Sequence, residues 1–273
     1  MKYTICQLNS VTGGQMNSYV ITTGDGKLLV VDGGYRADAE NLLAHLRRVS
    51  GQEIPHVDAW FLTHAHGDHI ECFNEVMGQH ADELTLGKVY YNFPSVQYLM
   101  REPGYGGAIR EFNALLPRFA DKIEIIYTGD EYDVGDAHVE VLYVPNGEIR
   151  SYINNTSSVF MVTLGGKRVL FLGDAEPAEG DRLLALYKGT GKLKADMVQM
   201  AHHGQGGVTF EVYEEIAPSA CFWGTPQWLW DNDVGKGFNT HVFKTVTVRE
   251  WMETLGVTGH YVLKDGAQTE EWE

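Results

Sequence analysis

The first third of the chain contains short runs of apolar and β-branched residues, each ended by glycine or another turn former. Runs of this kind between turn signals are typical of buried strands. They predict a meander of three strands and then a fourth strand, at residues 3–8, 18–22, 27–31 and 57–62. Between the third and fourth strands, apolar residues recur at helical spacing and predict an amphipathic helix over residues 37–49.

The remainder of the chain also alternates between the two patterns. Helical spacing of apolar residues predicts helices over residues 105–120, from Pro177, after Thr209 and from Val242 to Leu255. Further strands are predicted at residues 123–127, 138–144, 158–164, 168–172, 197–200, 220–223 and 259–263. Since no repeat or linker-like stretch interrupts this order, we expect one α/β domain over residues 1–273.

Composition and charge narrow the classes of function. The 273 residues carry 37 acidic and 21 basic side chains, a formal net charge of -16. Such a field repels phosphate backbones and anionic headgroups, so we expect a small-molecule substrate rather than extended nucleic acid or a membrane. The apolar runs are too short for a transmembrane helix. Three separated cysteines and no signal-peptide pattern favour a cytoplasmic location, whereas the oligomeric state stays open.

The motif His64-x-His66-x-Asp68-His69 follows the predicted strand at 57–62 directly. Imidazole nitrogens and carboxylate oxygens are the donors that divalent transition metals prefer. Alternate residues of an extended segment point the same way, so His64 and His66 can share one ion. Asp68 and His69 lie where a helix begins and can serve a second ion.

Two later strand ends carry further candidate ligands. Asp174 follows the strand at 168–172, and its carboxylate can bridge two ions, although an Asp in such a turn can also be only a helix cap. His202 and His203 follow the strand at 197–200, and we expect one to bind metal and the other to contact the substrate or support a ligand. The sequence therefore predicts two divalent ions, with Zn²⁺ favoured and manganese or iron as alternatives.

Taken together, these residues resemble the metallo-β-lactamase superfamily. The resemblance extends over nearly the whole chain and is nearest to the metallohydrolase domain of competence proteins and to phosphorylcholine esterases. It includes the motif at 64–69, the histidine pair, and the segments 31–34, 154–158, 173–176 and 239–241. It implies a four-layer αββα sandwich of two mixed β-sheets flanked by helices, with a binuclear site held by His64, His66, Asp68, His69, Asp174 and His203.

One position departs from the family pattern. Most members have a third histidine for the first metal about 20 residues before the bridging Asp, and no histidine lies between His138 and Asp174 here. Counting back leads to Asn154, whose amide oxygen is a weak zinc ligand. Asn154 is therefore a candidate ligand, with a simple turn as the alternative.

Aromatic residues supply candidate substrate contacts. Trp223, Trp228 and Trp230 lie close together in the sequence beside Asp231 and Asp233, a composition suited to an ammonium group. Packing in the core or at an interface is the alternative explanation for these rings. Tyr152 is a further candidate substrate contact, and His241 is a candidate to reach the site from a late loop.

The mechanism implied is two-metal hydrolysis, in which a hydroxide held between the ions attacks the substrate. Asp68 would orient the hydroxide, and His202 or His241 would donate a proton to the leaving group. We expect a phosphodiesterase or phosphoesterase for a small substrate. The alternatives are a DNA-processing nuclease, a lactam or thioester hydrolase, and an inactive or di-iron member.

Overall fold

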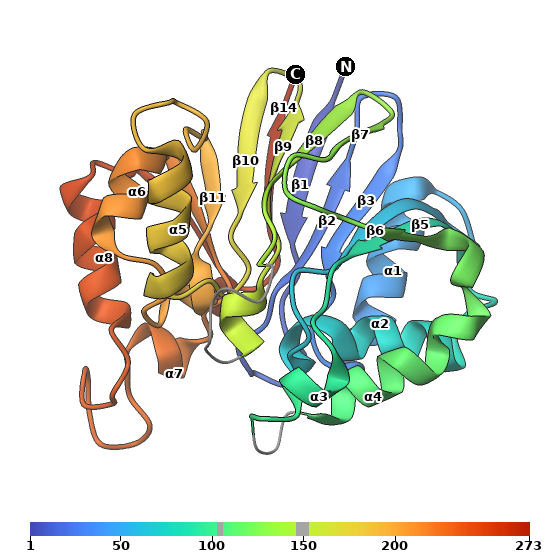
Figure 1. The fold of residues 1–273 in the computed structure, drawn as a ribbon, viewed down its shortest axis with the longest axis horizontal. Helices are drawn as coiled ribbons and strands as arrows, with labels where there is room; N and C mark the ends of the chain where they lie inside the picture. Colours follow the sequence, from blue (N-terminus) through green and yellow to red (C-terminus); the bar gives the residue numbers. More distant parts are fainter. Residues whose placement is uncertain (103–105, 146–152) are drawn as a thin grey trace.

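Two stacked β-sheets lie between two layers of helices in the computed structural model, which describes residues 1–102, 106–145 and 153–273 (Figure 1). Each sheet has seven strands, and each combines antiparallel with parallel pairs. The expected four-layer αββα architecture of two mixed sheets is thereby confirmed.

The first sheet has the order β14-β1-β2-β3-β4-β5-β6. Pairing is antiparallel from β14 to β3 and parallel from β3 to β6, so the predicted meander is confirmed. Its strands are β1 (Tyr3–Gln7), β2 (Ser18–Thr22), β3 (Leu28–Asp32), β4 (His56–Phe61), β5 (Thr85–Tyr91), β6 (Ile123–Ile125) and β14 (Gln268–Trp272).

The second sheet has the order β13-β12-β11-β10-β9-β8-β7. It is parallel from β13 to β10 and antiparallel from β10 to β7, the same division into halves as in the first sheet. Its strands are β7 (Glu131–Val134), β8 (Ala137–Tyr143), β9 (Val159–Leu164), β10 (Lys167–Phe171), β11 (Met197–Gln199), β12 (Ala220–Trp223) and β13 (Gly259–Val262).

Helices cover the outer face of each sheet (Figure 1). The first sheet is covered by α1 (Ala39–Ser50), α2 (Gly67–Gln79), α3 (Val96–Leu99) and α4 (Gly106–Leu115). The second is covered by α5 (Pro177–Tyr187), α6 (Phe210–Ile216) and α8 (Thr245–Thr254), with the short α7 (Gln227–Trp230) beside them. No helix within the described residues has the length and apolar character needed to cross a bilayer.

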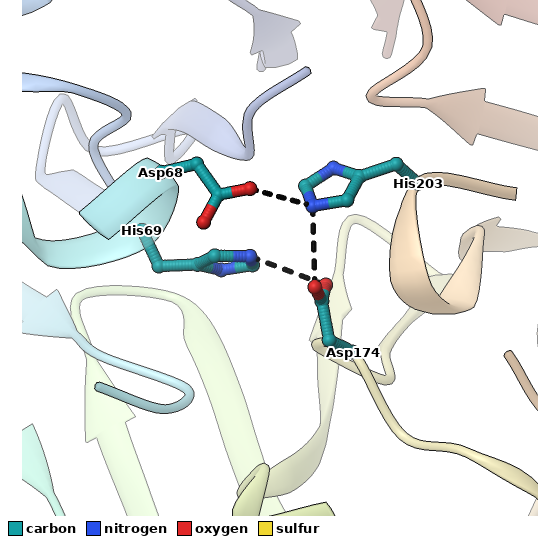
Figure 2. Close-up of side chains that lie close together, drawn as sticks. All are labelled: Asp68, His69, Asp174 and His203. Atoms are coloured by element: carbon teal, nitrogen blue, oxygen red, sulfur yellow. Dashed lines mark ion pairs between the residues drawn. The ribbon is translucent and has the colours of Figure 1, made fainter. Parts of the chain in front are cut away.

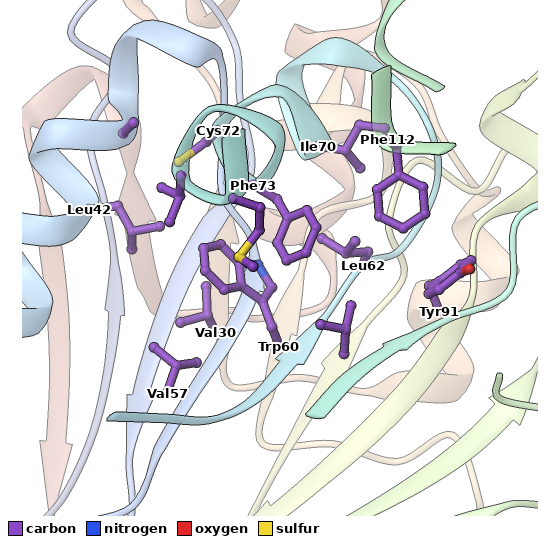
Figure 3. Close-up of a cluster of buried hydrophobic side chains, with 14 of the residues drawn as sticks. Val30, Leu42, Val57, Trp60, Leu62, Ile70, Cys72, Phe73, Tyr91 and Phe112 are labelled. Atoms are coloured by element: carbon purple, nitrogen blue, oxygen red, sulfur yellow. The ribbon is translucent and has the colours of Figure 1, made fainter. Parts of the chain in front are cut away.

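Strand residues alternate between two apolar layers because successive side chains point to opposite faces of a sheet. In β3, Leu28 and Val30 pack under α1 and α2, whereas Leu29 and Val31 pack between the two sheets. Trp60 and Phe73 meet edge to face in the helix-covered layer (Figure 3). Both faces of the central strands are thus buried, which holds the loops that follow them in place.

The elements near the chain ends and edges differ most from expectation. β5, β7 and β14 were not predicted, because Gly87 and Lys88 interrupt β5, and β7 and β14 are polar edge strands. The last helix begins at Thr245, so the prediction that it starts at Val242 is wrong, and the Val242 side chain is 83% exposed.

Candidate metal centre

The motif at 64–69 joins the end of β4 to the start of α2. His64 and His66 lie on the extended connection, while Asp68 and His69 lie in the first turn of the helix. This change of backbone direction divides the four side chains into two groups, as the spacing predicts. All four are buried, so their positions are set by packing rather than by solvent.

Four side chains from three separate segments form the first of two clusters, which we call the closed subsite: Asp68, His69, Asp174 and His203 (Figure 2). His203 Nε2 lies 3.1 Å from Asp68 Oδ2 and 3.2 Å from Asp174 Oδ2, and His69 Nε2 lies 3.2 Å from Asp174 Oδ1. Two imidazoles and two carboxylates at these separations can hold one divalent ion.

The second cluster, which we call the open subsite, consists of His64, His66 and Asp174. His64 Nε2 lies 3.1 Å from His66 Nδ1 and 3.8 Å from Asp174 Oδ2. Asp174 belongs to both clusters, so its carboxylate can bridge two ions. Of the seven side chains that the sequence proposed as ligands, six lie in these two clusters, and the seventh, Asn154, lines the adjoining pocket with His66 and Asp174.

The histidine pair lies in a strained turn after β11. His202, His203 and Gly204 have φ values of 50°, 53° and 76°, in the left-handed region that disfavours L side chains. A Cβ on Gly204 would lie 2.5 Å from the Trp223 ring, so only glycine fits there. This turn directs His203 into the closed subsite and leaves His202 on the wall of a pocket.

The charges of the closed subsite depend on one another in the metal-free protein. Burial alone would lower the pKa of His203, but the Asp174 and Asp68 carboxylates together raise it to about 9. Burial would raise the pKa of Asp174, but His203 and His69 hold it well below its usual value. Protons therefore occupy the cluster where a divalent cation, if bound, would replace them.

Fit to a metal is supported by the chemistry of the donor set. Asp174, His64, His69 and His203 are essentially inaccessible to solvent. Buried carboxylates and imidazoles in such numbers are costly unless they pair or coordinate a cation. Their nitrogen and oxygen donors are those of zinc, manganese and iron sites.

Asp32 supports the centre, a role that the sequence did not reveal. Its carboxylate accepts hydrogen bonds from the Thr63 backbone N–H at 2.8 Å and faces His69 Nδ1 at 2.7 Å. This contact leaves His69 Nε2 directed toward Asp174, the arrangement by which outer carboxylates orient metal-binding histidines. The signal available was the Asp32-Gly33-Gly34 turn, but its contact with His69 spans 37 residues.

Glu102 and Glu176 are two further carboxylates to which the sequence assigned no role. Glu102 Oε1 lies 3.6 Å from His66 Nε2, and its other oxygen accepts from the Ile153 N–H. The proximity of His66 lowers the pKa of Glu102. Glu176 Oε1 lies 3.7 Å from His202 Nδ1. Neither residue belongs to a sequence motif with a recognisable ligand spacing.

A pocket of about 510 Å³ opens onto both subsites. Its walls carry polar, acidic and aromatic side chains from several loops. They include Tyr35, His66, Asp68, Glu71, Glu102, Asn154, Asp174, His202, Gln205 and Phe243. Among the lining residues that the structure describes there is no lysine or arginine.

The tryptophan cluster lies elsewhere. Trp223 is fully buried, with its indole N–H 3.2 Å from His260 Nδ1, so the expectation that it contacts substrate is wrong. Trp230 packs edge to face on Trp223 and beneath Arg249, and Trp228 lines a different hollow. The expectation for Trp223 failed because composition cannot show which way a ring faces, whereas Trp228 and Trp230 are not among the residues that line the metal pocket.

Two other candidates are not placed at the centre. The His241 ring packs on Phe243, with centroids 4.7 Å apart, and His241 does not line the pocket. Tyr152 lies outside the described residues. Of the proposed proton donors, only His202 is therefore brought to the pocket.

Comparisons with known proteins agree with this geometry. The family model of the metallo-beta-lactamase superfamily matches residues 11–255. ComE operon protein 3 of Bacillus subtilis is 26% identical over 175 residues, 63% of this chain and 20% of that protein. A UPF0173 metal-dependent hydrolase of Thermodesulfovibrio yellowstonii is 27% identical over 180 residues, 62% of this chain and 61% of that protein. The chain thus spans less than two thirds of either relative.

Solved structures show the same fold. The metallo-beta-lactamase fold protein YhfI from Bacillus subtilis superposes with a TM-score of 0.59 at 15% identity, over 99% of each chain. The family match and the UPF0173 relative support a metal-dependent hydrolase. The extent of the family match shows that the chain belongs to the metallo-β-lactamase superfamily.

Proposed function

We propose that the chain is a metal-dependent hydrolase that uses two divalent ions to cleave a small phosphoester, most simply a phosphodiester. The observation that carries the proposal is the shared carboxylate of Asp174, which joins two ligand clusters at the base of one pocket. A pair of ions on either side of one carboxylate is the arrangement used to stabilise both oxygens of an in-line displacement at phosphorus.

Bound ions would supply a water molecule of lowered pKa and would polarise the scissile bond. The chain itself fixes the geometry. His64 and His66 would hold one ion, and His69, His203 and Asp68 the other, with Asp174 between them. Asp32 keeps the His69 ring turned toward Asp174, so that this nitrogen needs no reorganisation when a metal binds.

His202 is the residue proposed to move a proton. Its Nε2 lies 3.9 Å from Asp174 Oδ2 on the pocket wall, and Glu176 lies behind its Nδ1. Burial lowers the pKa of His202, which favours the neutral ring. A neutral imidazole backed by a carboxylate can accept a proton and return it to a leaving group.

The pocket favours a compact substrate. A volume of about 510 Å³ accommodates a small molecule, and the described lining has no cationic side chain to follow a phosphate backbone. Solved structures of this fold include a diphosphatase of the PhnP family and a diiron β-hydroxylase, at 14% and 16% identity. The fold alone therefore does not choose the reaction, and the phosphoester proposal depends on the pocket and the bridging carboxylate.

A substrate panel tests the proposal. Protein loaded with zinc, manganese or iron is assayed for kcat/KM with bis-p-nitrophenyl phosphate, nitrocefin, S-lactoylglutathione and plasmid DNA. We expect the phosphodiester to be preferred. A clear preference for the lactam or the thioester would overturn the phosphoester proposal, and a preference for DNA would favour the nuclease alternative.

A further inference from the structure

Glu176 lies at the centre of a hydrogen-bond network beside the open subsite. Its Oε1 accepts from Asn154 Nδ2 and its Oε2 from Asn155 Nδ2, both at 3.1 Å. Its own N–H donates to Asn155 Oδ1 at 3.1 Å. Both oxygens of the carboxylate are therefore occupied, and the side chain is held in one position.

This carboxylate decides which way the Asn154 amide points. A carboxylate only accepts hydrogen bonds, so the group facing Glu176 Oε1 must be the NH₂ of Asn154. The same NH₂ lies 3.3 Å from His202 Nε2, which can accept a hydrogen bond from the second hydrogen of the amide. The amide oxygen is consequently turned away from both partners.

That oxygen is buried and has no hydrogen-bond partner within the described residues. Asn154 is 93% buried, since only 7% of its surface is accessible, and it lines the pocket together with His66 and Asp174. A buried acceptor without a partner is destabilising, so the position of this oxygen beside the open subsite calls for an explanation. The open subsite beside it has three protein donors, against four in the closed subsite.

The same contacts select one tautomer of the neutral His202 ring. Because Asn154 Nδ2 can only donate, His202 Nε2 accepts and its proton lies on Nδ1, the atom that faces Glu176. Glu176 thus contacts two side chains that border the open subsite. It contacts Asn154 at the amide NH₂ and His202 at the ring Nδ1.

We infer that Glu176 is a positioning residue that turns the Asn154 amide oxygen into the open subsite, where the oxygen serves as the donor that a third imidazole would otherwise supply. The inference rests on the proposed two-ion site. Because an amide oxygen is a weaker zinc donor than imidazole, the open subsite binds Zn²⁺ more weakly than the closed one.

Stepwise Zn²⁺ binding to the full chain, measured by chelator competition, tests this inference without any assay of activity. Glu176→Gln replaces one of the two accepting oxygens by an NH₂ donor, so the side chain no longer accepts from both asparagine amides and no longer fixes the orientation of Asn154. We expect it to raise the weaker dissociation constant about 10–100-fold and to leave the tighter one unchanged. Asn154→Ala, which removes the oxygen and keeps Glu176, should weaken the same step.

Two further variants isolate the role of Glu176. Glu140→Gln changes a carboxylate of β8 that pairs with Lys192 and does not line the pocket, and it should leave both constants unchanged. Asn154→His supplies an imidazole, so the weaker step should tighten and the added effect of Glu176→Gln should shrink. Circular dichroism and the thermal midpoint of each variant verify that it folds.

Equal weakening of both steps by Glu176→Gln would contradict the inference, as would an unchanged weaker step in Asn154→Ala. These constants are independent of turnover. If they behave as expected while bis-p-nitrophenyl phosphate is not cleaved, the proposed reaction fails and the assignment of Glu176 stands.

Discussion

The closed and open subsites share Asp174 but differ in how completely the chain builds them. The closed subsite has four side chains, three of them almost wholly buried, and an outer carboxylate that fixes His69. The open subsite has two imidazoles and Asp174, and it borders the pocket through His66, Asn154 and His202. In the proposed two-ion site, the closed subsite would therefore hold its metal more tightly, and the open subsite would leave room for substrate oxygens.

The largest effect is expected from the residue common to both subsites. Asp174→Ala removes the carboxylate that would bridge the two ions and that pairs with His69 and His203. We expect the loss of at least one ion and a fall in kcat/KM of about a thousandfold or more. Metal analysis and kinetics measure the change. His138→Ala alters an exposed histidine paired with Asp133 and serves as the control, with no effect on either quantity. Full turnover in Asp174→Ala would show that the reaction does not require this carboxylate as a metal ligand.

The two subsites should separate in a paired comparison. His203→Ala removes a donor from the closed subsite only, whereas His64→Ala removes one from the open subsite only. We expect the first change to abolish the tighter Zn²⁺ binding step and the second to abolish the weaker one. Loss of the same step in both variants would show that the two clusters do not act as separate sites.

Asp32→Asn tests the support of the closed subsite. An amide has the size of the carboxylate but cannot balance the charge at His69 Nδ1, so the tighter Zn²⁺ constant should rise about 10–100-fold. The weaker constant should change less, because Asp32 orients His69 rather than His66. A larger effect on the weaker step would contradict this division.

The metal-free protein should lose stability as pH rises. The pKa of His203 in the fold is about 9, above its unfolded value, so the stability from its pairs with Asp68 and Asp174 is fully present below about pH 6.5. It is lost as pH rises through about 9. Urea unfolding at pH 6 and pH 9.5 should show this decline in the metal-free protein and a smaller one in the metal-loaded protein. Equal declines would contradict the proposed exchange of protons for metal.

The smallest effect is expected from Trp228→Ala. Trp228 lines a hollow separate from the metal pocket, so kcat/KM for the phosphodiester should stay within about twofold of the parent protein. A tenfold fall in kcat/KM in a folded Trp228→Ala variant would instead support the prediction that this tryptophan contacts the substrate.

Sequence reasoning was most successful where the signal is local. The meander, the helices on either side of the sheets and the motif at 64–69 depend on neighbouring residues, and their periodicity or spacing is visible in one stretch. Asp32, Glu102 and Glu176 depend on contacts between separate loops. Nothing near Glu176 in the sequence indicates that its carboxylate meets Asn154, 22 residues away.

The failures have the same physical origin. Trp223 belongs to an aromatic stretch that suggests a binding surface, but β12 directs its side chain into the helix-covered layer of the second sheet. β14 is a polar edge strand that is recognisable only by its pairing with β1 at the other end of the chain. Direction and partner are tertiary properties, and composition does not carry them.

Anomalous diffraction from crystals of the metal-loaded protein tests the central claim most directly. We expect two metal peaks per chain about 3.5–4 Å apart, with the Asp174 carboxylate in contact with both. The peak held by His69 and His203 should have the higher occupancy. A single peak under excess metal, or two peaks without contact to Asp174, would contradict the proposed two-ion site.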